Sequence, residues 1–258
     1  MANCHCSMCR KTHGAAFATY AGVDGDRLAW LAGEALITHY ESSPNFFRAF
    51  CRQCGSTVPG IAGDGHAFMP AGCFDEDPGV PAKAHIFVAS KAPWYEIPPG
   101  LPQFDAWPDP EAKTIERPEP EDSTSDIAGS CLCGTVRYEV RGPIDRVWNC
   151  HCSRCQKARA TAHATNGFAA IDDVVFTAGE DNLTDYKIPD AKFFTQTFCK
   201  SCGSIMPRKD PGRGIAVIPW GSVDTDPGRG PERHIFTSYK AAWHQIQDDL
   251  PQSPGAPG

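Results

Sequence analysis

The segment Asn149-Cys-His-Cys-Ser-Arg-Cys-Gln-Lys157 has a close copy near the start of the chain, Asn3-Cys-His-Cys-Ser-Met-Cys-Arg-Lys11. A second segment, Phe198-Cys-Lys-Ser-Cys-Gly-Ser204, likewise has a copy at Phe50-Cys-Arg-Gln-Cys-Gly-Ser56. The copies are 146 residues apart at the first segment and 148 at the second, so only small insertions separate them. A repeat of this length indicates two tandem domains rather than a solenoid of short units.

Two further matches extend the repeat toward the end of each copy. Pro70-Ala-Gly72 matches Pro219-Trp-Gly221, and the stretch from His85 to Trp94 matches the stretch from His234 to Trp243. We interpret these histidines and tryptophans as core-packing residues, with a substrate-binding wall as the alternative. The predicted organisation is a first domain over residues 1–107, a proline- and acid-rich linker over 108–126, a complete domain over 127–246 and a flexible tail over 247–258.

The two copies are unequal at their starts. The second copy opens with Cys131-Leu-Cys133-Gly and a strand-like stretch, nineteen residues before Cys150. The equivalent point of the first copy falls upstream of Met1. The sequence therefore predicts a first domain that is incomplete at its N-terminal side.

Composition limits the class of protein and its surroundings. The chain of 258 residues is 41% hydrophobic and 21% charged, as in ordinary globular proteins. A net charge of −7 without a basic run argues against a nucleic-acid partner. No apolar stretch is long enough to span a membrane and the start lacks a signal-peptide pattern, which favours a cytoplasmic location. In that reducing compartment, thirteen cysteines indicate metal binding rather than disulfides.

The expected secondary structure is mainly β. Thr135-Val-Arg-Tyr-Glu-Val140 alternates with period two, and frequent proline and glycine separate other short strands. The two short helices that we expect follow Cys9 and Cys155.

Four cysteines of the second copy form a plausible closed metal site. A Cys-x-x-Cys-Gly turn such as Cys199 to Gly203 presents two thiolates to one ion, and glycine supplies the left-handed conformation that the turn requires. Cys131 and Cys133, two residues apart on an extended segment, face the same side. Two pairs give the four thiolates of a structural zinc site.

The remaining three cysteines, Cys150, Cys152 and Cys155, match a catalytic zinc with an open fourth position. Other pairings among the seven cysteines fit the spacing too, as does one four-cysteine site with the rest simply buried. His5 and His151 lie within the triplet segments, but adjacent residues of an extended chain point opposite ways. We interpret both as neighbours near the surface rather than ligands.

The combined series Cys-x-Cys-Gly, Cys-His-Cys-Ser-x-Cys-x-Lys and Phe-Cys-x-x-Cys-Gly-Ser resembles the glutathione-dependent formaldehyde-activating enzyme family, also called the CENP-V/GFA family. The resemblance covers residues 127–246 and, in the first copy, residues 3–107. It implies tandem Mss4-like β domains that bind Zn²⁺.

The resemblance also implies roles for individual cysteines. Its structural zinc ligands match Cys131, Cys133, Cys199 and Cys202, and its catalytic ligands match Cys150, Cys152 and Cys155. In the first copy Cys4, Cys6 and Cys9 match the catalytic triplet, whereas Cys51 and Cys54 match only half of the structural set. These last two could instead share an ion with part of the N-terminal triplet.

A few other side chains allow two readings. Lys11 and Lys157 either attract a substrate carboxylate or are solvated surface lysines. Cys73, which has Ser222 as its counterpart, is expected to be a small buried residue rather than a ligand. The acidic pairs at 172–173 and 248–249 are expected in solvated loops.

The leading functional hypothesis is a zinc-dependent carbon–sulfur lyase that acts on a thiol–aldehyde adduct such as S-hydroxymethylglutathione. A zinc ion with three thiolate ligands is a soft Lewis acid that suits sulfur, whereas glutathione and formaldehyde come from the resemblance alone. The alternatives are a non-catalytic zinc scaffold, a thiol or formaldehyde carrier, and disulfide exchange by a Cys-x-x-Cys pair. The oligomeric state is open, although two linked copies could pack as an internal pseudo-dimer.

Overall fold

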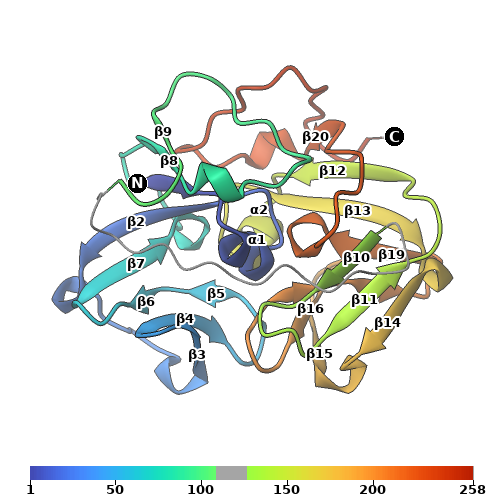
Figure 1. Cartoon of the computed structure of the whole chain (residues 1–258), viewed down its shortest axis with the longest axis horizontal. Coiled ribbons are helices and arrows are strands. Elements are labelled where there is room, and N and C mark those ends of the chain that lie inside the picture. The colour runs from blue at the N-terminus through green and yellow to red at the C-terminus, as the bar shows by residue number, and fades with distance from the viewer. Residues whose placement is uncertain (109–126, 258) are drawn as a thin grey trace.

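The computed structural model describes residues 1–108 and 127–257, so nearly all of the expected linker lies outside the described residues. The two copies lie side by side, with α1 (Ser7–His13) and α2 (Ser153–Arg159) near the centre of the molecule (Figure 1). Strands dominate each copy, as predicted, and no helix among the described residues is long and apolar enough to cross a membrane.

The first copy contains two sheets. The larger has the order β6-β7-β2-β1-β8-β9 and the smaller the order β3-β4-β5. Their strands are β1 (Ala2–Cys4), β2 (Ala18–Asp24), β3 (Ile37–Ser43), β4 (Phe46–Cys51), β5 (Thr57–Val58), β6 (Gly60–Ile61), β7 (His66–Pro70), β8 (His85–Ile86) and β9 (Gln103–Phe104).

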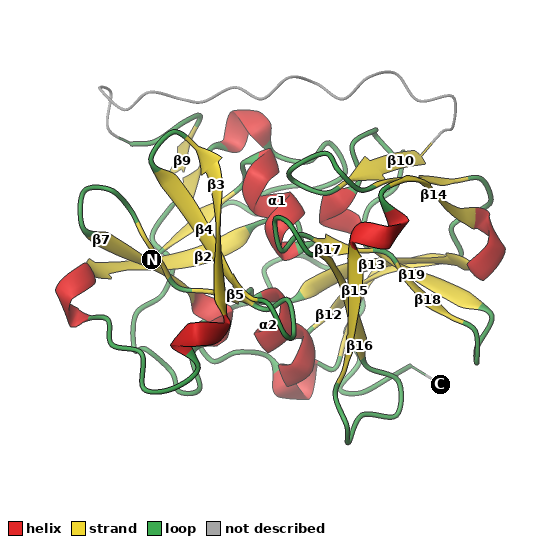
Figure 2. Cartoon of the chain, turned by 90° about the horizontal axis from the view of Figure 1, so that it is seen from below, coloured by secondary structure: helices red, strands yellow, loops and turns green. Residues whose placement is uncertain are grey.

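The second copy repeats these sheets as β18-β19-β13-β12-β20 and β15-β16-β17, and adds a third, β10-β11-β14. Its strands are β10 (Ile127–Ser130), β11 (Arg137–Val140), β12 (Arg146–Cys150), β13 (Ala164–Ala170), β14 (Val174–Ala178), β15 (Leu183–Lys187), β16 (Thr195–Cys199), β17 (Ile205–Met206), β18 (Arg208–Asp210), β19 (Ile215–Pro219) and β20 (Arg233–Ile235). Figure 2 shows the two small sheets, β3-β4-β5 and β15-β16-β17, one in each half.

Short 3₁₀ turns link the strands. They are η1 (Gly25–Arg27), η2 (Glu34–Leu36), η3 (Ala71–Cys73), η4 (Val88–Ser90), η5 (Ile171–Asp173), η6 (Glu180–Asn182), η7 (Trp220–Ser222) and η8 (Thr237–Tyr239).

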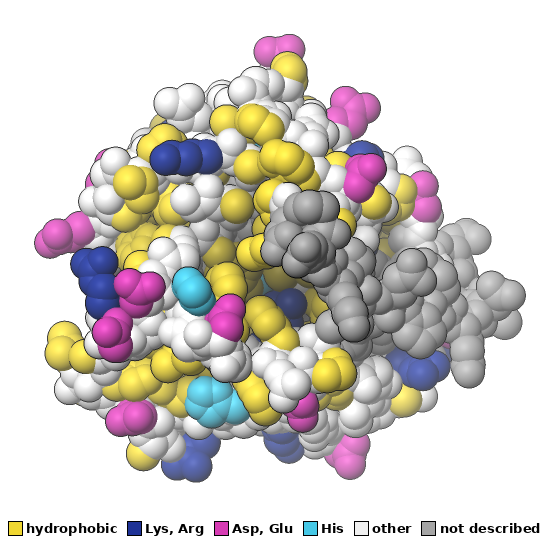
Figure 3. All heavy atoms as spheres, turned by 60° about the vertical axis from the view of Figure 1, so that its left-hand side comes forward, with side chains coloured by type: hydrophobic (Ala, Val, Ile, Leu, Met, Phe, Trp, Pro, Cys, Tyr) yellow, Lys and Arg dark blue, Asp and Glu magenta, His cyan; other side chains and the backbone are white. Residues whose placement is uncertain are grey.

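The described residues of the first copy contain no counterpart of β10 and β11. In the second copy β14 pairs with β11, but residues 28–32, at the equivalent place, form no strand. Since an extended segment needs a hydrogen-bonding partner to form a sheet, the absence of a β10–β11 counterpart leaves these residues irregular. Leu31 is 97% exposed there. On the left-hand side of the molecule as seen in Figure 1, hydrophobic side chains lie among scattered acidic and basic ones (Figure 3).

Both helices begin earlier than predicted. The Sγ atoms of Cys6 and Cys152 accept hydrogen bonds from the backbone N–H groups of Cys9 and Cys155, each at 3.4 Å. A cysteine sulfur thus accepts the capping hydrogen bond in place of the usual side-chain oxygen, and it places the third cysteine of each triplet inside the first helical turn. The helices therefore contain Cys9 and Cys155 rather than follow them.

Glycines let the two copies pack closely as a pseudo-dimer. A Cβ atom on Gly72 would overlap backbone atoms of Ala160 and Thr161, and one on its counterpart Gly221 would overlap the carbonyl oxygen of Arg10. The matched Pro-x-Gly motifs are therefore docking points for the helix of the opposite copy. The main hydrophobic core also combines residues of both copies, including Phe17 and Trp220.

The two knuckle turns pack on each other across the same pseudo-two-fold relation. Gly55 adjoins the ring of Phe198, and its counterpart Gly203 adjoins the ring of Phe50. The two rings meet edge to face, with centroids 6.4 Å apart. Both glycines have φ near +70°, so the left-handed conformation predicted for Gly203 is confirmed.

Part of the segment expected to be a flexible tail, residues 251–255, is hydrogen-bonded to β20 and the residues after it. The backbone N–H of His234 donates to Pro251 O at 2.9 Å, that of Ser253 donates to His234 O at 2.9 Å, and that of Phe236 donates to Gly255 O at 3.1 Å. A parallel bridge joins His234 to Gln252. The tail thus covers the open edge of β20, as β9 covers β8 in the first copy.

Candidate metal centres

Ten of the thirteen cysteines fall into three clusters whose sulfur atoms lie within 4.8 Å of one another. The clusters are Cys131, Cys133, Cys199 and Cys202; Cys150, Cys152 and Cys155; and Cys4, Cys6 and Cys9. These are the groupings that the sequence predicted. Within the described residues no such cluster joins Cys51 or Cys54 to the N-terminal triplet, so the shared ion considered for them finds no support.

The four-cysteine cluster fits a tetrahedral ion. The sulfur of Cys133 lies 3.4 Å from that of Cys131 and 3.8 Å from that of Cys199. A tetrahedron with metal–sulfur bonds of about 2.3 Å has sulfur–sulfur edges of about 3.8 Å, so these spacings suit zinc. Cys131 and Cys199 also accept hydrogen bonds from Val136 N and Asn182 Nδ2, each at 3.2 Å, which favours thiolate sulfur.

The triplet of the second copy lies between β12 and α2. Cys150 ends the strand and is buried, whereas Cys152 and Cys155 are half-buried. Three thiolates without a fourth protein ligand suit a zinc ion that keeps one position for an external ligand. Hydrogen bonding from Cys150 lowers the pKa of Cys152 to about 3, so this cluster readily holds a thiolate.

The triplet of the first copy has the same backbone setting but a different neighbour. Both terminal nitrogens of the Arg48 guanidinium donate to the sulfur of Cys9, at 3.6 Å each. Hydrogen bonding from Cys4, helped by the charge of Arg48, holds the pKa of Cys9 well below its usual range. Sequence reasoning missed this arginine because its counterpart in the second copy is Gln196.

The histidines within the triplet segments are buried, contrary to the expectation of a near-surface place. His5 and His151 have no exposed surface. Nε2 of His5 lies 2.8 Å from Nδ1 of His85, and Nε2 of His151 lies 2.8 Å from Nδ1 of His234. They do point away from the cysteines, as predicted, but that side of the strand faces the junction of the copies.

Asp248 belongs to this histidine network and is not merely solvated. Its carboxylate accepts hydrogen bonds from His234 Nε2 at 2.9 and 3.1 Å. Burial, with like charge from neighbouring cations, lowers the pKa of His5, His151 and His244 to about 3. These imidazoles are therefore neutral near pH 7.

A cavity of about 500 Å³ opens between the copies behind the strands that carry the triplets. Its floor pairs equivalent positions, with Phe17 and Tyr95 from the first copy facing His163 and His244 from the second. No cysteine lines it, so it is separate from the thiol clusters. His163 and His244 align with Phe17 and Tyr95 in the first copy, so no repeated motif marked these two histidines in the sequence.

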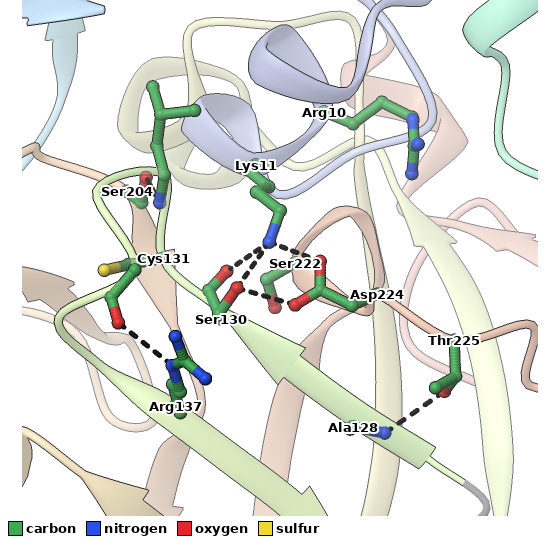
Figure 4. A network of polar contacts seen from close by, with 12 residues as sticks. Arg10, Lys11, Ala128, Ser130, Cys131, Arg137, Ser204, Ser222, Asp224 and Thr225 are labelled. Carbon is green, nitrogen blue, oxygen red and sulfur yellow. Dashed lines mark hydrogen bonds and ion pairs between the residues drawn. The ribbon is translucent and has the colours of Figure 1, made fainter. Parts of the chain in front are cut away.

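The two lysines after the triplets pair with acidic residues of the opposite copy. The reading as a solvated surface lysine fits Lys157, whose side chain is 44% exposed, and is wrong for Lys11, whose side chain is 14% exposed. Lys11 forms an ion pair with Asp224 and donates to Ser130 Oγ at 2.6 Å (Figure 4). Lys157, its counterpart, lies 2.6 Å from the carboxylate of Asp75.

The repeated tryptophans and Cys73 lie outside the cysteine clusters. Trp94 is buried in the core, whereas Trp243 is half-buried and lines the cavity. Cys73 is half-buried, its thiol donates to Thr57 O at 3.3 Å, and burial raises its pKa to about 12. It belongs to none of the three clusters.

Parts of the chain are similar to known proteins. A protein of Halomonas elongata, provisionally named a glutathione-dependent formaldehyde-activating enzyme, is 29% identical over 127 residues, which cover 47% of this chain and 81% of that protein. A crystal structure of a Rhodobacter sphaeroides protein aligns with 35% of this chain and 82% of its own, at 23% identity and a TM-score of 0.28. That score is too low to carry an argument about the fold.

The family model supplies the stronger match. The model described as glutathione-dependent formaldehyde-activating enzyme matches residues 1–90 and again residues 126–239. The two matches coincide with the two copies and contain all three cysteine clusters. The chain therefore belongs to the glutathione-dependent formaldehyde-activating enzyme family, with two copies of the family domain in one polypeptide.

Proposed function

We propose that the protein is a zinc-dependent carbon–sulfur lyase that acts on a thiol–aldehyde adduct such as S-hydroxymethylglutathione. The observation that carries the proposal is the contrast within the second copy. One cluster supplies four thiolates and the other supplies only Cys150, Cys152 and Cys155. The first is complete for a structural ion, and the second keeps a place for a substrate sulfur.

The burial of the three triplet cysteines is consistent with a site that binds an external sulfur. Cys152 and Cys155 are half-buried, so an external sulfur can approach from their side, while buried Cys150 anchors the site to β12. Zinc, when bound there, supplies a soft Lewis-acidic position that stabilises a substrate sulfur as thiolate. The Cys152 cap fixes the helix start, so the three sulfurs converge without rearrangement.

The reaction balances without a redox partner. The carbon–sulfur bond of the adduct breaks with its electron pair on sulfur, the hydroxyl oxygen forms the carbonyl of formaldehyde, and the hydroxyl proton passes to solvent. Protonation of the released thiolate completes the exchange. The reverse sequence forms the adduct from thiol and aldehyde.

The test compares the wild-type protein with Cys152→Ala in exchange of S-hydroxymethylglutathione with ¹³C-formaldehyde, followed by exchange NMR. Thiols add to formaldehyde unaided, so the rate without protein is subtracted. We expect Cys152→Ala to reduce the exchange to the unassisted rate and Cys73→Ala, outside every cluster, to retain it. Equal rates for wild type and Cys152→Ala, with zinc still bound in the triplet, would refute the proposal.

A second candidate is a non-catalytic zinc-binding scaffold or carrier module. It draws support from the first copy, in which Cys51 and Cys54 form no four-cysteine cluster with other described residues. If the protein is an enzyme, added glutathione should perturb the metal of a triplet. The charge-transfer bands of the cobalt-substituted protein would report this change. A scaffold predicts unchanged bands. Thirteen free thiols suit the reducing cytoplasm in either case.

A further inference from the structure

Two arginines, Arg48 and Arg159, are buried without a carboxylate partner. Arg48 is 7% exposed and Arg159 is 9% exposed. Within residues 1–108 and 127–257, neither forms an ion pair with an aspartate or glutamate. A buried guanidinium is strongly destabilising unless a negative charge lies beside it, so each requires an anion of another kind.

For Arg48 that anion is the triplet of the first copy. Both terminal nitrogens point at the sulfur of Cys9, and the Nε atom is buried without a partner. Burial by itself would lower the pKa of Arg48, but the negative charge of Cys9 raises it above its ordinary value. His13, on the same helix face as Cys9, adds no charge because burial lowers its pKa to about 4.

For Arg159 the negative charges that act on the guanidinium belong to the triplet of the second copy. Arg159 follows Cys155 by four residues on α2, so the two side chains share one face of the helix. Its terminal nitrogens donate to Gly14 O at 3.4 Å and Asn166 Oδ1 at 3.2 Å, which are neutral oxygens. Burial lowers its pKa to about 10, while the charges of Cys155 and Cys150 act in the opposite direction.

The two arginines do not occupy equivalent positions. The counterpart of Arg48 is Gln196 on β16, and the counterpart of Arg159 is His13 on α1. Gln196 donates to Cys54 O and Ala158 O instead of to a thiol. A buried guanidinium on a strand thus contacts the first triplet, and another lies one helical turn after the last cysteine of the second.

We propose that Arg48 and Arg159 are the counter-charges of two metal–trithiolate centres, one in each copy, and that each arginine is needed for its own centre to hold the ion. A divalent ion with three thiolates carries one net negative charge, which one guanidinium cancels. The first copy therefore binds an ion although it lacks half of the structural set. The inference rests on the proposed function only in taking zinc as the metal.

The experiment uses the full chain and reciprocal variants. Arg48→Gln and Arg159→His each introduce the residue of the opposite copy, so each variant is the matched control of the other. Arg48→Lys and Arg159→Lys retain the charge. Zinc is removed stepwise with a chromophoric chelator, and each triplet is followed by alkylation of its cysteines and peptide mass spectrometry.

We expect Arg48→Gln to weaken zinc protection of Cys4, Cys6 and Cys9 by about 10- to 100-fold and to leave the second triplet unchanged. Arg159→His should weaken zinc protection of Cys150, Cys152 and Cys155 and leave the first triplet unchanged. Each lysine variant keeps the positive charge, so it should weaken protection less than the neutral variant at the same position. Weakening of both triplets alike, or of neither, in folded variants would overturn the proposal.

Wild-type protein alone provides a second test, should a variant fail to fold. Zinc must protect Cys4, Cys6 and Cys9 from alkylation in the wild-type chain, and the absence of protection overturns the inference. No readout depends on turnover. If lyase activity is absent while both triplets retain zinc in an arginine-dependent way, the proposed function fails and this inference stands.

Discussion

Lys11 of the first copy forms an ion pair with Asp224 of the second, and the equivalent residues Lys157 and Asp75 repeat the pair in the opposite direction. The two pairs differ in their surroundings. The side chains of Lys11 and Asp224 are 14% and 7% exposed, whereas those of Lys157 and Asp75 are 44% and 88% exposed. The difference arises because only the second copy has β10, whose Ser130 covers the first pair and donates to Asp224 at 2.6 Å.

Lys11→Met should destabilise the protein by about 3 kcal/mol, because it leaves the Asp224 carboxylate buried without a cation. Lys157→Met is the matched control and should cost less than about 1 kcal/mol, since its partner is solvated. Urea unfolding followed by circular dichroism measures both free energies. Similar values for the two variants would contradict the assigned difference in burial.

Gly221→Ala should destabilise the junction of the copies by about 1–3 kcal/mol, because the added methyl group overlaps the backbone of Arg10 and Ala15. Gly22→Ala is the control, since a Cβ there meets no atom within 4 Å. Thermal unfolding distinguishes the two. A Gly221→Ala protein as stable as Gly22→Ala would mean that the copies do not pack through this glycine.

Acid should destabilise the protein through its buried histidines. Burial disfavours the charged imidazole and lowers the pKa of two neighbouring histidines below the unfolded-state value of about 6.5. The pKa of His244 falls to about 3, and that of His163 is also well below its ordinary value. The unfolded chain then binds more protons than the folded one below pH 6.5. The free energy of unfolding therefore keeps its full value above pH 6.5 and decreases as the pH falls toward 3. Each histidine lowers it by up to about 1.4 kcal/mol per pH unit.

His163→Phe, which introduces the residue of the first copy, removes one of these groups. The slope of unfolding free energy against pH between 6 and 4 should therefore be smaller in the variant. Thiolate protonation affects both proteins equally and cancels in the difference. Parallel curves would show that His163 is already charged in the folded state.

Metal removal should act most strongly through the four-cysteine cluster. Cys199→Ser should reduce bound zinc by one ion per chain and lower the unfolding temperature by about 10 °C, because metal binding there contributes directly to folding. Cys73→Ser should change neither quantity. Elemental analysis with calorimetry provides the measurement, and an unchanged zinc content in Cys199→Ser would exclude the predicted ligand set.

The repeat, the mainly β fold and the three cysteine clusters could be predicted because their signals are local. The triplets lie within six residues, and a strand followed by a capped helix brings such neighbours together whatever the rest of the chain does. Cys131 and Cys133 join Cys199 and Cys202 from far along the chain. Because a structural zinc ion takes four thiolates, the sequence favoured this set among the pairings that the spacing allows.

Sequence alone determined which thiols cluster and that the chain contains two unequal copies. Only the tertiary structure decided what surrounds each cluster, because those contacts cross between the copies or come from distant strands. Arg48 reaches Cys9 from β4, Lys11 reaches Asp224, and the side of β12 that bears His151 faces the junction rather than solvent. Burial and charge pairing at such places depend on how the two copies dock, and no local pattern of residue types encodes that geometry.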